Sequence, residues 1–152
     1  MGQAREVMDR VTTAMNSKDK EAMAACYADD AVAFTPDQGR INGREAITNY
    51  LFQLWEALPD VTYESTNKYE DGNVAIDEGV VTGTNTGPLT FPNGETLQPT
   101  GKQMKVRSCD IVHVEEDQVK THHFYFDQME FMAQLGLLPE SMTQSMSTTE
   151  GR

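Results

Sequence analysis

Four long segments of alternating apolar and polar residues occupy the second half of this chain. They are VTYESTNKYE (61–70), NVAIDEGVVTGTNTG (73–87), KQMKVRSCDIVHVEE (102–116) and QVKTHHFYFD (118–127). Alternation with a period of two turns one side of each segment towards a core, which is typical of half-buried strands. The breaks DGN and ED, and a loop rich in Gly, Pro and Asn, favour hairpin connections. We therefore predict four strands of one antiparallel sheet.

The residues before this region have the spacing of helices. Apolar residues at steps of three and four predict helices over 5–16, 18–28 and 42–58, with a brief strand over 29–39. Ser17 is expected to cap the second helix. Asn42 stands three residues before Glu45, which is typical of a capping box at the start of the third helix.

Three helices followed by a run of hairpin-connected strands predict an α+β fold. The helices are expected to cover one face of a curved antiparallel sheet, and a curved sheet covered in this way encloses a pocket. At 152 residues the chain suits one domain, which we place at 1–138. The polar segment 139–152 is expected to be a disordered tail.

The charge balance restricts the partners. Lys and Arg total 12 against 24 Asp and Glu, which gives a net charge of −12. Such a surface repels nucleic acid and anionic membranes, so a small neutral molecule is the expected ligand. Cys26 and Cys109 lack the spacing of a metal or redox motif and are expected to be inert thiols. The N-terminal residues lack the apolar run of a signal peptide, which predicts a soluble, cytoplasmic protein.

Several segments together resemble a known family. They are YADDAVAF, INGREAI, LPDVTYE, GTNTGPL and the long stretch from LQPTGKQMKV to FMAQLGL. In this order they are similar to the SnoaL-like polyketide cyclases of the nuclear transport factor 2-like superfamily, from about residue 5 to 138. The resemblance implies a cone of curved sheet and helices around a pocket, and a homodimer. It also implies an intramolecular aldol closure that needs no metal or cofactor.

The resemblance also implies catalytic residues. In such cyclases an aspartate on the last strand is the acid–base group, and a histidine on the preceding strand assists; these roles fall on Asp127 and His113. Asn85 occupies a position where the family often has histidine, and it is a candidate for substrate binding.

Asp127 allows a second interpretation from the residues alone. Asp127 precedes Glu130 by three residues, just before an apolar stretch, which is typical of a capping box. A cap carboxylate accepts backbone N–H groups, which lowers its pKa, whereas a dry pocket raises it. The sequence leaves both roles open.

The histidines depend on the hairpin between the last two strands. A plain two-residue turn at 116–117 places His113 and Asp127 on opposite faces of the sheet. A bulge shifts the register by one residue and brings them to the same face. His123 shares the side of Asp127 on its own strand and is a second catalytic candidate. His122 points the other way, so the adjacent pair is poorly placed to share a metal ion.

The remaining candidates concern substrate binding. An apolar wall for a ring-shaped ligand is predicted from Phe34, Tyr50, Leu54, Trp55 and Tyr125, although the same residues suit an ordinary core. Arg107 is a candidate for binding a carbonyl or carboxylate, with a surface salt bridge as the alternative.

These observations predict a cofactor-independent, SnoaL-like enzyme acting on a small hydrophobic compound that contains a carbonyl group. The expected chemistry is polyketide cyclase-type aldol closure or a related acid–base isomerisation. Two alternatives stay open. One is a hydrolase or dehydratase that uses the same aspartate, and the other is a dimeric protein that binds a small molecule without changing it.

Overall fold

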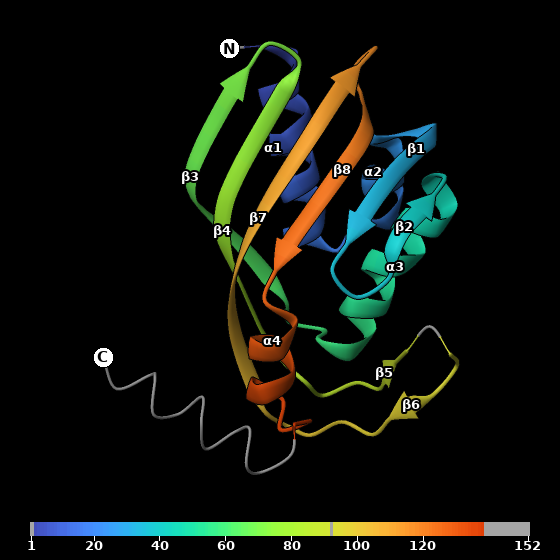
Figure 1. The fold of residues 1–152 in the computed structure, drawn as a ribbon, viewed down its shortest axis with the longest axis vertical. Coiled ribbons are helices and arrows are strands. Elements are labelled where there is room, and N and C mark those ends of the chain that lie inside the picture. The colour runs from blue at the N-terminus through green and yellow to red at the C-terminus, as the bar shows by residue number, and fades with distance from the viewer. Residues whose placement is uncertain (1, 92, 139–152) are drawn as a thin grey trace.

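A computed structural model of the chain describes residues 2–91 and 93–138. In chain order its elements are α1 (Gln3–Ser17), α2 (Lys20–Ala25), β1 (Tyr27–Thr35), β2 (Gly39–Asn42), α3 (Arg44–Ala57), β3 (Thr62–Asp71), β4 (Val74–Thr84), β5 (Leu89–Thr90), β6 (Thr96–Leu97), β7 (Gln103–Glu115), β8 (Gln118–Phe126) and α4 (Gln128–Gln134). A curved, unclosed sheet covered by helices confirms the predicted α+β class (Figure 1). The tail predicted at 139–152 lies outside the described residues.

The main sheet has six strands in the order β2-β1-β8-β7-β4-β3. The four alternating segments form β3, β4, β7 and β8, which pair as antiparallel neighbours as predicted. The expectation of a purely antiparallel sheet is wrong at one junction, because β1 pairs with β8 in parallel. The sheet thereby joins the N-terminal segment directly to the last strand and extends to β2 at its edge.

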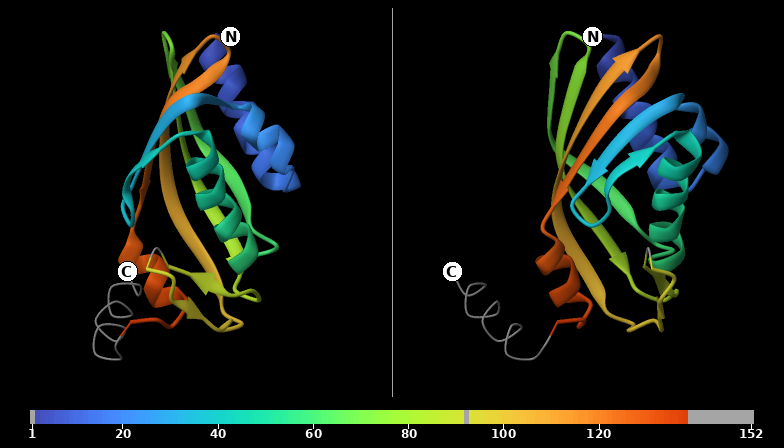
Figure 2. Two further views of the ribbon diagram at one scale, coloured as in Figure 1. Left: turned by 90° about the vertical axis from the view of Figure 1, so that its right-hand side faces the viewer. Right: turned by 45° about the vertical axis from the view of Figure 1, so that its right-hand side comes forward.

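Helices α1, α2 and α3 lie on the same face of this sheet, and the sheet curves around them (Figure 2). We call this the inner face and the opposite side the outer face. The burial pattern of α1 is that of an amphipathic helix, and its buried residues are Ala4, Arg5, Val7, Met8, Val11, Ala14 and Met15. None of the helices in the described residues is both long and apolar enough to span a membrane.

Two predicted helix caps are wrong. Asp19, not Ser17, caps α2, because its side chain accepts the N–H of Ala22. Ser17 still belongs to α1, and its hydroxyl donates to the carbonyl of Thr13 one turn earlier. The N-cap of α3 is Gly43, which makes no side-chain cap bond. Asn42 instead ends β2, where its side chain accepts a hydrogen bond from Arg40.

The hairpin between β7 and β8 combines the two registers considered from sequence. Glu116 and Asp117 adopt φ angles of 50° and 64°, the left-handed conformation that a tight two-residue turn requires. Glu115 therefore pairs with Gln118, but the register then shifts, and His113 faces Thr121. Lys120 is the extra residue of this bulge.

The bulge decides which side chains share a face. Beyond it, even-numbered residues of β7 face even-numbered residues of β8, as in the pairs Val112–His122, Asp110–Phe124 and Ser108–Phe126. Odd-numbered residues pair in the same way on the other side. The even-numbered set lies on the inner face, towards the helices, and it supplies every residue of β7 and β8 that lines the cavity except Tyr125.

A buried ion pair and a helix-capping carboxylate attach α1 to β4 and β3, the last two strands at one edge of the sheet. Arg5 and Asp77 form an ion pair of 2.6 Å between Nη1 and Oδ1, and their side chains are 7% and 0% exposed. The carboxylate of Glu70 accepts the backbone N–H groups of Gly2 and Arg5 at 3.0 and 2.9 Å. Glu70 therefore serves the start of α1, where the first N–H groups have no partner within the helix.

Candidate functional site

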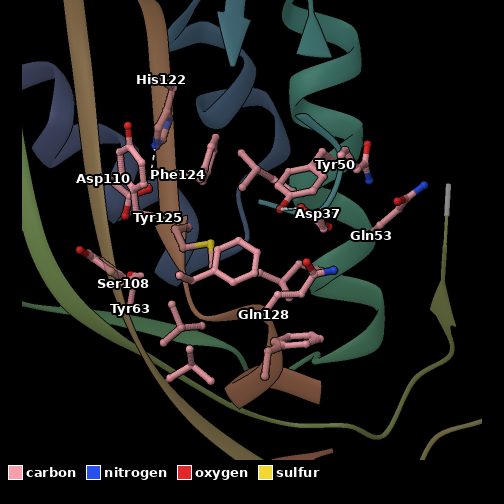
Figure 3. Close-up of a pocket in the computed structure, with 18 of the residues that line it drawn as sticks. Asp37, Tyr50, Gln53, Tyr63, Ser108, Asp110, His122, Phe124, Tyr125 and Gln128 are labelled. Atoms are coloured by element: carbon pink, nitrogen blue, oxygen red, sulfur yellow. Dashed lines mark hydrogen bonds and ion pairs between the residues drawn. The ribbon is translucent and has the colours of Figure 1, made fainter. Parts of the chain in front are cut away.

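A cavity of about 330 Å³ lies between the inner face of the sheet and helices α1, α3 and α4. Its wall is mainly apolar, and Met8, Met15, Leu54, Val106, Phe124 and Phe131 contribute to it. Figure 3 shows polar groups at separate places on this wall. A mainly apolar cavity with a few polar groups is the usual form of a small-molecule site.

Three neighbouring strands supply a chain of hydrogen bonds to the cavity wall. Nε2 of His122 on β8 lies 2.8 Å from Oδ1 of Asp110 on β7. Nδ1 of the same histidine lies 2.8 Å from the hydroxyl of Tyr27 on β1. Tyr27 and His122 are buried, while the Asp110 side chain is 16% exposed. These hydrogen bonds thus connect the buried Tyr27 phenol, through His122, to the Asp110 carboxylate, which can be reached from the cavity.

The protonation of Tyr27 decides which group donates in each of these hydrogen bonds. Burial, and secondarily the charge of Asp110, raises the pKa of the Tyr27 phenol well above its ordinary value. The phenol therefore stays neutral and can donate to Nδ1 of His122, which leaves the Nε2 proton for Asp110. Within the described residues Oδ2 of Asp110 has no hydrogen-bond partner. This oxygen can exchange a proton with a bound molecule.

Packing holds the histidine in place. His122 and Phe124 alternate on the same face of β8, and their rings stack with centroids 3.7 Å apart and planes 8° from parallel. Tyr50 of α3 packs edge-on against Phe124. A ring stacked on one side and bonded at both nitrogens has little freedom to turn, which suits a group that orients a carboxylate.

The rim of the cavity carries polar groups from α3, α4 and the β1–β2 turn. The hydroxyl of Tyr50 donates to Oδ1 of Asp37 at 2.9 Å. Gln38, Gln53 and Gln128 also belong to the lining. The lining formed by described residues includes Asp37 and Asp110 but no Lys or Arg. A free carboxylate or phosphate would find no cationic partner there, so this wall suits neutral ligands.

Asp127 lies at the start of α4 and not in the cavity lining. Its Oδ1 accepts the N–H groups of Met129 and Glu130 at 3.0 and 3.1 Å. The side chain is exposed. The structure therefore gives Asp127 the cap geometry, and its catalytic role stays a prediction.

The two predicted histidines share the outer face, as the bulged register requires. His113 lies 3.0 Å from the hydroxyl of Thr121. His123 stacks between Phe34 and Tyr125, with centroid distances of 4.8 and 6.2 Å. Burial lowers the pKa of His123, and the neighbouring histidines act in the same direction. Neither His113 nor His123 belongs to the cavity lining.

The predicted substrate-binding residues are divided among three places. Tyr50, Leu54 and Tyr125 contribute to the cavity lining, and their role in substrate binding stays a prediction. Phe34, Arg107 and again Tyr125 border a shallow groove on the outer side. Trp55 is buried in the core, where its indole N–H donates to the sulfur of Met15.

Asn85 has a structural position. It is 2% exposed, and its amide donates to the carbonyls of Ala57 and Gly87. Its side-chain oxygen accepts both the backbone N–H and the hydroxyl of Thr100. These four bonds use the donor and acceptor capacity of the amide to join the end of α3 to the loop after β6. Asn85 is absent from the cavity lining of the described residues.

Sequence reasoning missed the group that the fold brings together. Asp110 and His122 are twelve residues apart, and Tyr27 is 95 residues from His122. The available signal was the parity of the bulged register, which grouped Asp110 with His122.

Within the described residues no set of three or more His, Cys, Asp or Glu side chains is placed to hold a metal ion. Cys26 and Cys109 form no disulfide.

Comparison with known proteins places this geometry in context. The sequence model of the SnoaL-like domain matches residues 8–122, a range that includes Asp110 and ends at His122. No curated protein matches the chain. Among solved structures, a proposed SnoaL-like polyketide cyclase from Jannaschia sp. CCS1 has a TM-score of 0.78 and 17% identity, covering 90% of this chain and 94% of that one.

Two further structures share the fold. IdmH from Streptomyces antibioticus, a proposed polyketide cyclase, has a TM-score of 0.73 and 22% identity over 89% of this chain and 99% of its own. An epoxide hydrolase of the LEH-like type from M. tuberculosis has a TM-score of 0.65 and 16% identity over 88% and 89%. At these identities the likeness concerns the fold, which these proteins combine with different chemistries.

Proposed function

The chain belongs to the SnoaL-like domain family, and on that premise we propose that its cavity binds a small apolar carbonyl compound and transfers a proton at the carbon beside the carbonyl. The observation that carries this proposal is the hydrogen-bonded series Tyr27–His122–Asp110. It ends at Oδ2 of Asp110, which has no hydrogen-bond partner within the described residues. Asp110 acts as the acid–base group, and His122 orients it.

The proposed chemistry begins with the removal of a proton from the carbon next to the carbonyl. The C–H bond breaks, the proton goes to Oδ2 of Asp110, and the electron pair forms an enolate with its charge on the oxygen. In an aldol closure the enolate carbon then attacks a second carbonyl of the same molecule. Asp110 returns the proton to the new alkoxide, so one carboxyl serves both steps. A compound of the polyketide type offers both carbonyls.

The surroundings of Asp110 support this role. The wall around it is mainly apolar, and excluding water from a reacting carboxylate strengthens its interactions with a bound substrate. The lack of Lys and Arg in the lining of the described residues favours a substrate without a free acid group. Asp127, the carboxylate indicated by the family resemblance, is the competing candidate for the same proton transfer.

A second candidate reaction is hydrolysis, in which Asp110 would remove a proton from a water molecule that attacks the substrate. The fold that the chain shares with an epoxide hydrolase supports hydrolysis as the second candidate. A third is a binding protein that leaves its ligand unchanged. Only the first reading requires proton exchange at carbon.

Deuterium exchange into β-tetralone tests the proposal without the natural substrate, because this bicyclic ketone has acidic C–H groups beside its carbonyl. We expect the protein in D₂O to exchange these hydrogens faster than buffer alone, as followed by NMR. Asp110→Asn should lower the catalysed rate about a hundredfold or more, the usual range for loss of a general base. Asp127→Asn is the matched control and should retain the rate.

Three results would contradict the proposal. Exchange no faster than in buffer would remove the carbon acid–base function. A rate lost in Asp127→Asn but kept in Asp110→Asn would return the role to Asp127. Tight binding of the ketone without exchange would favour a binding protein.

A further inference from the structure

The rim of the cavity carries four polar side chains from three separate elements. They are Asp37 and Gln38 in the β1–β2 turn, Gln53 of α3 and Gln128 of α4, and we call them the rim subsite. None of the three amide side chains has a hydrogen-bond partner within the described residues, because Gln38 bonds only through its backbone N–H. Asp37, Gln53 and Gln128 are exposed and Gln38 is half-buried, so a bound molecule can reach all four.

Asp37 keeps one carboxylate oxygen free. Its Oδ1 accepts the hydroxyl of Tyr50 at 2.9 Å, and its Oδ2 accepts no hydrogen bond within the described residues. Burial, and secondarily the charge of Asp37, raises the pKa of the Tyr50 phenol well above its ordinary value, so the phenol stays a donor to Asp37. Thr35 also lies within hydrogen-bonding reach of this phenol. The Tyr50 hydroxyl is therefore occupied, and Oδ2 of Asp37 is the atom that lacks a donor.

The rim subsite and Asp110 lie on opposite sides of the cavity. Tyr50 and Gln53 are three residues apart on α3, so they share one side of that helix. Figure 3 shows Asp37 and Gln53 towards α3 and Asp110 on the other side. The wall between them is mainly apolar and includes Phe124, which packs against Tyr50. A ligand that reaches both places must carry a polar group at each end of an apolar body.

The chemistry of the rim subsite selects a hydroxyl group. The Asp37 carboxylate only accepts hydrogen bonds, so the ligand must donate, whereas a glutamine amide both donates and accepts, as a hydroxyl does. A carboxylate or phosphate would be repelled by Asp37 and would find no Lys or Arg in the lining of the described residues. An ammonium group would gain little from a carboxylate that is exposed to solvent, and it cannot accept from the amides.

We propose that the rim subsite binds a hydroxyl group at the end of the ligand remote from its carbonyl. The hydroxyl donates to Oδ2 of Asp37 and accepts from the amides of Gln53 and Gln128. The place of the carbonyl at Asp110 rests on the proposed function, whereas recognition of the hydroxyl does not. The ligand class is thereby narrowed to an apolar ring compound with a carbonyl at one end and a hydroxyl at the other.

Three ketones with one skeleton test this inference. β-Tetralone, 6-hydroxy-β-tetralone and 6-methoxy-β-tetralone differ only on the ring that does not carry the carbonyl. The hydroxyl can donate a hydrogen bond, and the methoxy group can only accept one. Dissociation constants from NMR titration should show that the wild type binds the hydroxy ketone about three- to tenfold more tightly than the methoxy ketone, the effect of one hydrogen bond.

Asp37→Ala should abolish this preference, because it removes the acceptor that distinguishes the two substituents. Asp71→Ala is the matched control. It removes the same charge from an exposed position outside the cavity lining. That variant should keep the preference and change each dissociation constant by less than about twofold, because salt screens distant exposed charges.

A double variant tests the amides separately from the carboxylate. Gln53→Ala combined with Gln128→Ala should weaken binding of the hydroxy ketone about three- to tenfold and that of β-tetralone by less than about twofold. Gln98→Ala combined with Gln103→Ala is the matched control, because both of these glutamines are exposed and lie outside the cavity lining. It should leave all three dissociation constants unchanged.

The outcomes separate this inference from the proposed function. No preference for the hydroxy ketone in wild type, or a preference that survives Asp37→Ala, overturns the inference, whatever the deuterium exchange shows. Loss of the preference in Asp71→Ala as well would attribute it to net charge and also overturn the inference, as would unchanged binding in the variant that lacks Gln53 and Gln128. If the preference depends on Asp37 but β-tetralone does not exchange, the rim subsite stands and the catalytic proposal fails.

Discussion

Asp110 and His122 lie 2.8 Å apart on adjacent strands, and both side chains face the cavity between the sheet and the helices. The contact depends on the bulge at Lys120, which brings even-numbered residues of β7 and β8 to the same face. His122 in turn contacts Tyr27, so β1, β8 and β7 are connected through their side chains as well as through their backbones.

His122→Phe should destabilise the protein by about 1–3 kcal/mol. The substitution leaves the buried Tyr27 hydroxyl without its acceptor, which incurs the desolvation penalty of an unpaired polar group. Adding Tyr27→Phe removes that hydroxyl, so the double variant should be less destabilised than the sum of the two single variants. Urea unfolding of all four proteins measures the coupling. Strict additivity would mean that the two groups do not depend on each other.

Asp127→Ala should lower stability by about 1 kcal/mol, the usual effect of removing an N-cap side chain. Asp127→Asn retains an oxygen that can accept from Met129 or Glu130 and should lose less. Thermal unfolding gives the stabilities, and deuterium exchange into β-tetralone gives the activities. Equal activity in both variants and the wild type fits a cap. Loss of activity in Asp127→Asn at unchanged stability would instead support the catalytic role, which stays a prediction.

Arg5→Met should destabilise the protein by about 3–5 kcal/mol, because it leaves the carboxylate of Asp77 buried without its cation. Arg10→Met is the matched control. Arg10 pairs with Asp117 at 2.7 Å, but these side chains are 50% and 55% exposed. An exposed pair contributes little, so the control should lose less than about 1 kcal/mol. Similar losses in the two variants, measured by urea unfolding, would mean that burial does not decide the effect.

Stability should fall in acid partly through Glu70. The backbone N–H groups of Arg5 and Gly2 hold its pKa below the ordinary value of 4.5. A carboxyl with a lowered pKa contributes stability above its unfolded value, and this contribution is lost as pH falls through the lower folded value. Glu70→Gln should therefore be less stable than wild type near neutral pH, and the difference should shrink below about pH 4.5. A difference that does not vary with pH would contradict this assignment.

We predict that the protein is a homodimer formed through the outer face of the sheet. Tyr125 is 52% exposed on this face, beside Phe34 and His123. Light scattering should give the mass of two chains, and Tyr125→Asp should shift it towards one. Met129→Asp alters a side chain of similar exposure, 46%, on α4 and should leave the mass unchanged. A single-chain mass for wild type at micromolar concentration would exclude this assembly.

The strands could be predicted from sequence because alternation reports one buried face directly. Three of the four long segments form strands within one residue of the predicted bounds, and the fourth, β4, ends three residues early, at Thr84. The parallel pairing of β1 with β8 could not be predicted in this way, because periodicity says which side of a strand is buried and not which strand lies beside it. The caps were misplaced because Ser17 and Asn42 have the right chemistry but face other partners.

The site was predictable only in part. The register of the hairpin depended on a bulge that the residues allow but do not require, and Asp127 occupies a position where a cap and a catalytic group have the same sequence pattern. Tyr50 and Leu54 could be placed on one side of α3 because a helix puts apolar residues at regular steps, and that side borders the cavity. Asp110 and His122 could be grouped only through the parity of that bulged register, and the contact of His122 with Tyr27, 95 residues away, carries no local signal.

The bulge at Lys120 also affects how insertions and deletions would act in this hairpin. Deleting Lys120 would remove the unpaired residue, and every other pair between β7 and β8 could keep its partner. Deleting Thr121 while the bulge persists would move each later residue of β8 to the opposite side. His123 would then point inwards in place of His122. A deletion at Lys120 is therefore tolerable, whereas a deletion at Thr121 would turn His122 towards the outer face and His123 towards the cavity.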